Sequence, residues 1–281
     1  MPRPTPLSFR KQYSRIMQGT DQEVDLARAA LLISGEIYPD LDMKRYLGLL
    51  DSMAEDVLRS TPSSGDPRHT AEALSEYLFR QQGFRGNDED YYDPRNSYLN
   101  QVLDRQLGIP ITLSLVYIEV GRRIGLPIEG IGLPGHFVVK VVGASDDLFV
   151  DPFNGGRLMA SHECVEAVQS MFHGRVSFSP EHLRPYSSRQ LLVRLLGNLK
   201  IHYLQQNQLR RALASTDLMV ITDPTATNNY KDRAAMLAQI GQHGLAVQDL
   251  GKYLEIDPEA TDAPEVRRQI RTLWHIIAPP N

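Results

Sequence analysis

The sequence has a single cysteine, Cys164, among its 281 residues, and it has no long apolar run. One cysteine excludes an intramolecular disulfide and any zinc or iron–sulfur site built on several cysteines. The longest apolar stretch, 109–120, is interrupted by polar residues and falls well short of the roughly 20 residues that span a bilayer. The histidines are scattered, and neither a P-loop nor an H-E-x-x-H motif is present. We therefore expect no cofactor, no metal and no membrane insertion.

An excess of charge of one sign is also lacking. The chain carries 30 basic and 34 acidic residues, for a formal net charge of −4. This balance gives no general affinity for nucleic acid or for acidic membranes, so we expect no nucleic-acid partner. With 42% hydrophobic and 23% charged residues, the composition is that of a soluble globular protein. The length predicts two domains with a sizeable buried core.

The first twenty residues, MPRPTPLSFRKQYSRIMQGT, have no apolar segment of the kind found in secretory signals. We therefore expect a cytoplasmic protein. The same residues are basic and free of acidic side chains, which leaves an organellar transit peptide as the alternative. We expect residues 1–20 to form a loose lead-in without regular structure.

Apolar residues at helical spacing predict a layer of helices in the first part of the chain. The predicted helices span 23–37, 41–58, 70–82 and 97–107. Asp40 is the expected cap of the second helix. Pro110 then suits the first turn of a helix that runs to about Ile124, because proline has no N–H to lose there. That helix is apolar on several faces, so we expect it to be central and buried.

The sequence pattern changes after Gly125. Three short runs rich in β-branched and aromatic residues predict antiparallel strands at 127–133, 136–142 and 148–153. Residues 161–172 then predict one more helix. The Pro- and Ser-rich stretch 177–187 is the expected connector between two domains.

The C-terminal part contains a repeat. The segments ITDPTA, 221–226, and EIDPEA, 255–260, lie 34 residues apart. A helix–turn–helix period of about 34 residues is typical of tetratricopeptide repeats. Predicted helices over 190–205 and 264–276 flank the two copies. Stacked repeats of this kind present a concave face, so we expect a protein partner to bind there.

Two residues indicate half of a catalytic site. His136 follows a Pro-Gly turn at the start of one predicted strand, and Asp151 ends the next. Antiparallel neighbours can bring the two side chains within hydrogen-bond distance, where the carboxylate fixes the imidazole tautomer. The simpler interpretation is that His136 is structural and that Asp151 begins a turn, DPFNGG, in which its side chain bonds the backbone. Both interpretations can hold together.

A nucleophile for this pair is harder to find. The start of the helix after Pro110 favours an anion, and its only hydroxyls are those of Thr112 and Ser114. Thr112 can simply bond a backbone group, and Ser114 lies one turn further along in a packed stretch. Cys164 lies beyond Asp151 on a separate predicted helix, so it is no substitute.

The motifs N-S-x-L, G-I-P-I-T-L, P-G-H-F and D-P-F-x-G-G occur in this order along the chain. Residues 20–160 thereby resemble the transglutaminase-like core of bacterial SirB-type proteins. The resemblance implies an α+β fold, with a transglutaminase/papain-like core and an N-terminal helical layer over 1–180, followed by tetratricopeptide-like helices over 187–278. It also implies that His136 and Asp151 occupy two positions of the superfamily's Cys-His-Asp triad. The cysteine position then falls on Pro110, which has no nucleophile.

We therefore expect a non-catalytic scaffold, adaptor or assembly factor that binds a protein partner through its repeats and its cleft. The residues expected to line the cleft are Asn96, Pro110, Thr112, His136, Asp151 and Asn154. One alternative is an acyl-transfer enzyme or hydrolase in which Thr112 or Ser114 serves His136 as nucleophile. Another is a receptor for a small molecule or a peptide end, with His136 and Asp151 as polar anchors.

Overall fold

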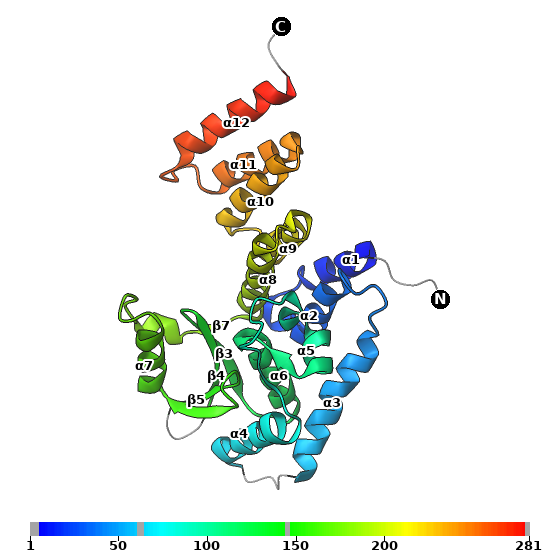
Figure 1. The fold of residues 1–281 in the computed structure, drawn as a ribbon, viewed down its shortest axis with the longest axis vertical. Coiled ribbons are helices and arrows are strands. Elements are labelled where there is room, and N and C mark those ends of the chain that lie inside the picture. The colour runs from blue at the N-terminus through cyan, green and yellow to red at the C-terminus, as the bar shows by residue number, and fades with distance from the viewer. Residues whose placement is uncertain (1–5, 61–64, 144–146, 279–281) are drawn as a thin grey trace. The chain divides into compact units, whose positions relative to one another are not determined.

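A computed structural model of the chain describes residues 6–60, 65–143 and 147–278 (Figure 1). The polypeptide divides into two compact units, Met1–Leu195 and Leu196–Asn281. The division falls inside helix α8, Ser188–Gln205. Helices account for 64% of the described residues and strands for 10%, a mixture of helix and sheet.

The first unit begins with a layer of helices. They are α1 (Pro6–Ile16), α2 (Leu26–Gly35), α3 (Met43–Ser60), α4 (Pro67–Ser75), α5 (Leu99–Arg105) and α6 (Pro110–Arg123). A π-helical turn, η2 (Glu76–Gln81), continues α4, and short 3-10 turns occupy Asp21–Glu23 and Pro94–Ser97. Every residue of α6 from its start to Gly121 is buried, so the prediction of a central buried helix is confirmed.

The expectation of an irregular N-terminal lead-in is wrong for the residues that form α1; residues 1–5 lie outside the described residues. Phe9 and Tyr13 lie one turn apart on this helix, and both are buried. The Phe9 ring comes so close to α2 that a Cβ added to Gly35 would lie 2.4 Å from it. This aromatic pair gives the segment an apolar face in spite of its many basic residues.

Two helix starts differ from those expected. Asp42, and not Asp40, caps α3, because its carboxylate accepts hydrogen bonds from the backbone N–H groups of Lys44 and Arg45. Helix α4 begins at Pro67, where the side chain of Asp66 accepts from the N–H of Arg68. An Asp-Pro pair is a favoured helix start, so the sequence already carried this second signal.

The sheet of the first unit has five antiparallel strands in the order β6-β5-β4-β3-β7. They are β3 (Ile128–Leu133), β4 (His136–Val141), β5 (Leu148–Asp151), β6 (Arg157–Ala160) and β7 (Pro185–Tyr186). The three predicted strands are confirmed as β3, β4 and β5, with Leu133 opposite His136 and Val139 opposite Val150. Strand β7 lies in the stretch 177–187 that the sequence indicated only as a connector. A separate parallel pair joins β1 (Arg85–Gly86) to β2 (Leu107–Gly108).

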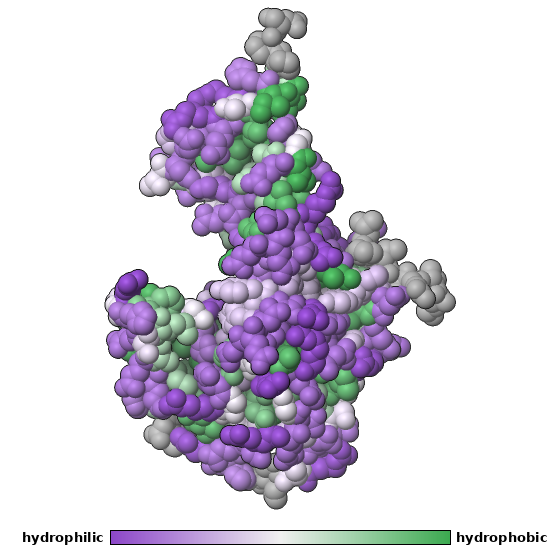
Figure 2. Space-filling model, viewed as in Figure 1, coloured by the Kyte–Doolittle hydropathy of each residue, from purple (hydrophilic) through white to green (hydrophobic). Residues whose placement is uncertain are grey.

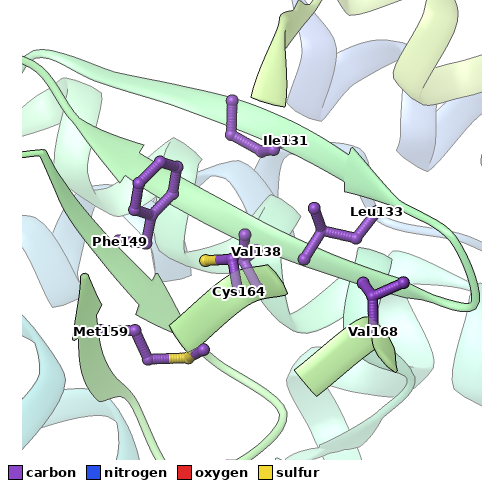
Figure 3. Packing of buried hydrophobic residues seen from close by; sticks show 7 residues of the cluster. All are labelled: Ile131, Leu133, Val138, Phe149, Met159, Cys164 and Val168. Carbon is purple, nitrogen blue, oxygen red and sulfur yellow. The ribbon is translucent and has the colours of Figure 1, made fainter. Parts of the chain in front are cut away.

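Side chains on the two faces of this sheet pack against different helices. Val138 and Phe149 pack with Cys164 and Val168 of α7 (Ser161–Met171) in the cluster shown in Figure 3. The next residue of β4, Phe137, points to the other face because side chains alternate along a strand. There a Cβ added to Gly130 would meet the ring of Phe137 and the Ile118 side chain of α6. The sheet is therefore covered by α6 on one face and by α7 on the other.

The second unit is helical. After the end of α8 come α9 (Leu209–Thr222), α10 (Thr227–Gln239), α11 (His243–Ile256) and α12 (Ala263–Ile277), the last three stacked side by side (Figure 1). Its core includes Tyr230, Leu237, Leu250 and Tyr253. The guanidinium of Arg233 makes two hydrogen bonds of 2.6 and 2.7 Å to Asp249 and one of 3.2 Å to Asp217, which ties α10 to α11 and α9. This is the stacked-helix arrangement that the 34-residue repeat predicted.

Candidate functional site

His136 and Asp151 lie side by side in the sheet. Gly135 precedes His136 in the left-handed conformation, at φ +66°, which a glycine adopts without strain. The turn therefore delivers His136 to the first position of β4, while Asp151 is the last residue of β5. The imidazole Nε2 lies 2.9 Å from Oδ2 of Asp151, and both residues are buried.

Asp151 is held from several sides. Its Oδ1 accepts hydrogen bonds from the backbone N–H groups of Phe153 (3.1 Å) and Asn154 (3.3 Å), and its Oδ2 also accepts from the side-chain amide of Asn154 (2.8 Å). Burial alone would raise the pKa of this carboxyl, but the bonds from His136 and Asn154 outweigh it and hold the pKa below the ordinary 3.8. An ionised Asp151 accepts the proton of Nε2, so the lone pair of the neutral ring resides on Nδ1.

Aromatic side chains connect the His136 ring to the start of α6. The ring meets Phe153 edge to face at 6.0 Å, and Phe153 meets Tyr91 in the same manner at 6.1 Å. Phe153 also packs directly on the backbone of Gly86, where an added Cβ would lie 2.6 Å from its ring. Gly86 pairs with Gly108, two residues before Pro110. The acidic loop around Tyr91 thus contributes to the wall of the site.

Arg194, which the sequence analysis did not single out, holds the turn before His136. Its guanidinium donates hydrogen bonds to the backbone carbonyls of Leu133 (2.8 Å) and His136 (2.5 Å). It also lies over the rings of Phe137 and Tyr186, at 5.4 and 5.9 Å. In the sequence, Arg194 is a charged residue among the leucines of α8, and this pattern could have indicated a buried functional contact.

Neither of the two candidate hydroxyls is hydrogen-bonded to the imidazole. The Thr112 hydroxyl donates to the backbone carbonyl of Asn96 at 2.7 Å and accepts from the N–H of Ile109 at 3.1 Å. The Ser114 hydroxyl donates to the carbonyl of Phe137 at 3.3 Å. Over 6–60, 65–143 and 147–278, Asp151 is the one side chain hydrogen-bonded to the His136 ring.

A matched pair of substitutions tests the structural role of Thr112. We expect Thr112→Val to lower the free energy of unfolding by about 1–3 kcal/mol, because it leaves the buried Asn96 carbonyl and Ile109 N–H unpaired. Ser114→Ala breaks one long hydrogen bond and is expected to cost less than about 1 kcal/mol. Urea unfolding measures both values, and equal costs would contradict the assigned role.

The other residues expected to line the cleft are found in different settings. Asn96 is fully buried, and both ends of its side-chain amide have hydrogen-bond partners. The oxygen accepts from Asn87 and Arg105, and the NH2 group donates to the carbonyl of Asp90. Pro110 is buried in the first turn of α6. Asn154 is exposed and lines an open pocket of about 380 Å³ beside α4. The structure thus puts Asn96 and Pro110 within the wall and Asn154 at the surface.

Cys164 is part of the apolar packing between α7 and the sheet (Figure 3). Its side chain is fully buried, and burial, reinforced by the negative charges of Asp151 and Glu163, raises the pKa of the thiol to about 12. A thiol with such a pKa is almost entirely protonated at neutral pH and is a poor nucleophile. Cys164 therefore behaves as a small apolar side chain.

Several other kinds of site find no support in the described part of the chain. There, no three His, Cys, Asp or Glu side chains are placed to hold a metal ion. Within the same residues, no helix is both long and apolar enough to cross a membrane. Residues 130–135 happen to fit the spacing G-x-G-x-x-G, but they lie in β3 and the turn to β4. A dinucleotide-binding turn precedes a helix, so this segment is not one.

The fold and the His136–Asp151 pair together define the class of protein. A family profile described as the transglutaminase-like superfamily matches residues 44–197, more than half of the chain. A tetratricopeptide-repeat profile matches residues 199–271. The chain belongs to the transglutaminase-like superfamily, and the two-part layout expected for a SirB-type protein is confirmed.

Relatives align with most of this chain. The chain is 39% identical over 252 residues to a UPF0162 protein of Xylella fastidiosa. The aligned residues make up 88% of this chain and 89% of that protein. It is 25% identical over 253 residues to a UPF0162 protein of Vibrio cholerae, covering 90% and 93%. A shorter match reaches F-box only protein 21 of Mus musculus, with 34% identity over 140 residues, which are 46% of this chain and 21% of that protein.

Proposed function

We propose that this protein is a non-catalytic binding factor, a scaffold, adaptor or assembly factor, whose transglutaminase-like unit keeps a His–Asp pair without a nucleophile. One observation carries the proposal. The His136 ring is hydrogen-bonded to Asp151, while the hydroxyls of Thr112 and Ser114 are committed to backbone carbonyls. The buried thiol of Cys164, with its pKa of about 12, supports the same conclusion. We place the protein in the cytoplasm, which its lone unpaired cysteine favours.

The second unit supplies a surface for a partner. A groove of about 670 Å³ lies along α10, α11 and α12, and its lining includes the small residues Ala234, Ala235 and Ala238 of α10 and Leu250 of α11. Arg268, Gln269 and Leu273 of α12 also line the groove. The surface of this unit is mostly hydrophilic, with apolar patches at the end of α12 (Figure 2), where Trp274 and Ile276 are more than half exposed. Tetratricopeptide repeats generally mediate protein interactions, and this groove suits that role.

The groove can be blocked without disturbing the core. Ala235 is exposed and lines the groove, so Ala235→Arg is expected to fill the groove sterically and abolish partner capture from lysate of the native host. Gln239→Arg adds the same side chain to an exposed position of α10 outside the groove and is expected to leave capture unchanged. Retention of every partner by Ala235→Arg, with circular dichroism unchanged, would contradict binding through this groove.

An acyl-transfer enzyme or hydrolase is the alternative function. The pairing of an ionised Asp151 with His136 favours it, because this is the arrangement that makes an imidazole a general base. In that case a nucleophile has to reach Nδ1, the nitrogen opposite Asp151.

A further inference from the structure

Helix α12 exposes a large aromatic side chain near its end. Trp274, the only tryptophan of the chain, is 53% exposed. Ile277, three positions later and therefore on the same side of the helix, is 41% exposed. The terminal helix of a repeat stack usually has a polar outer face. An exposed Trp–Ile pair is thus unusual for a helix that only caps the stack.

The repeat shows what covers the same position one copy earlier. The segments ITDPTA and EIDPEA lie 34 residues apart, so Ile240 at the end of α10 has the repeat position of Trp274. Ile240 is half-buried, because it packs against the cluster that contains Ala246 and Leu250 of α11. On α10, therefore, the following helix covers the position that α12 leaves exposed.

An arginine shows the same difference between the two copies. Arg233 of α10 makes two hydrogen bonds to Asp249 of α11 and one to Asp217 of α9. Arg267 follows Arg233 by 34 residues and is exposed on α12, without an ion pair to any described residue. The position equivalent to Asp217 is Gly251, where an added Cβ would meet no atom within 4 Å. Arg267 thus lacks both carboxylate partners of its counterpart.

A second cation lies on the same side of α12. Arg271 follows Arg267 by four residues and Trp274 by seven, a spacing that puts all three on one side of a helix. Arg271 is exposed and has no ion pair within 6–60, 65–143 and 147–278. Tryptophan and arginine are enriched at the binding hot spots of protein interfaces. We call the side formed by these three residues the outer surface of α12.

The small number of cations favours an acidic protein over other anionic partners. Anionic membranes are recognised by clusters of about four to eight basic residues. Proteins that bind DNA through its charge make on the order of six to ten phosphate contacts. The outer surface of α12 has two uncompensated arginines beside one apolar centre. It therefore suits an apolar side chain accompanied by carboxylates.

We propose that the outer surface of α12 binds an acidic amphipathic helix of a partner protein, in the manner in which α10 binds α11. A carboxylate of the partner pairs with Arg267 as Asp249 pairs with Arg233, and the charge of Arg271 adds to the attraction. The apolar side of the partner helix covers Trp274. None of the three residues of this surface lines the groove described above, so either proposal can fail without the other.

The fluorescence of Trp274 tests the proposal directly, because the chain has no other tryptophan. The probe is a lactam-stapled helical peptide with the sequence of α11, residues 243–256, which contains no tryptophan. We expect its titration into the full chain to shift the emission to shorter wavelength and to saturate, since the peptide removes the indole from water. Absence of a saturable shift, while circular dichroism shows a folded protein, overturns the proposal.

Charge exchange locates the contact. Arg267→Glu is expected to weaken binding of this peptide roughly fivefold, and Asp249→Lys in the peptide should have a similar effect on the wild-type protein. Combining the two changes should recover most of the affinity. Arg210→Glu reverses a charge at an exposed position of α9 and should change nothing. Equal binding to Arg267→Glu and wild type, or no recovery in the combination, overturns the assignment.

Two controls address other occupants of this surface. Vesicles of phosphatidylcholine and phosphatidylserine are expected to leave the emission of Trp274 unchanged, and a shift would assign the surface to membranes instead. The emission of the protein alone should not depend on its concentration. A concentration-dependent shift that is lost in Arg267→Glu would assign the surface to a second copy of the chain and overturn the proposal.

Discussion

Replacing Asp151 with alanine is expected to lower the free energy of unfolding by about 3–5 kcal/mol, the typical cost of removing one partner of a buried charged network. The carboxylate accepts hydrogen bonds from the His136 ring, from two backbone N–H groups and from the amide of Asn154. Alanine leaves these donors without a partner in a site that water scarcely reaches. Urea denaturation followed by circular dichroism gives the value.

Asp151→Asn is the matched control, because it keeps one acceptor oxygen for the two backbone N–H groups while it removes the charge and replaces the second acceptor oxygen with an NH2 group. We expect it to cost about 1–2 kcal/mol. It should also change the dependence of stability on pH. The pKa of Asp151 in the folded protein lies below its ordinary 3.8, so its contribution is complete above that pH and is lost as the pH falls through the folded value. Asp151→Asn should lack this component, and a cost below about 1 kcal/mol for Asp151→Ala would refute the network.

Replacing Arg194 with alanine is expected to cost about 2–4 kcal/mol, from two charge-assisted hydrogen bonds and its contacts with two aromatic rings. Its side chain bonds the carbonyls of Leu133 and His136, so its loss frees the turn that places the imidazole. We therefore expect the ring nitrogen signals of His136 in ¹⁵N NMR spectra to shift and broaden. A purely global loss of stability would leave these signals unchanged in the folded fraction.

Two further variants provide comparisons for the loss of stability expected from Arg194→Ala. Arg194→Lys keeps the charge but lacks the planar fork that reaches both carbonyls, so we expect it to recover less than half of the loss. Arg210 is exposed on α9, and Arg210→Ala is expected to change stability by no more than about 0.5 kcal/mol. A cost for Arg194→Ala as small as that of Arg210→Ala would show that the carbonyl contacts contribute little.

Local sequence patterns predicted much of the site. The alternation of β-branched residues predicted β3, β4 and β5, and two adjacent strands place His136 beside Asp151 when they pair in antiparallel fashion. The DPFNGG turn predicted a carboxylate that bonds its own backbone, and Asp151 does so in addition to holding His136. Both features depend on residues close together in sequence, where turn and strand chemistry is informative.

The parts that the sequence did not predict depend on contacts between distant residues. Strand β7 is only two residues long, too short for a sequence pattern to predict. It is placed by the ring of Tyr186, which packs over Gly132. Arg194 acts on carbonyls about sixty positions earlier in the chain.

Intact-protein mass spectrometry after treatment with a fluorophosphonate and with iodoacetamide tests the absence of a nucleophile most directly. The hydroxyls of Thr112 and Ser114 are bonded to backbone carbonyls, and the thiol of Cys164 is buried. The native wild-type protein is therefore predicted to gain no adduct, while unfolding in urea is predicted to expose Cys164 to iodoacetamide. A stoichiometric adduct on Thr112 or Ser114 in the native protein, absent from His136→Ala, would contradict the non-catalytic function.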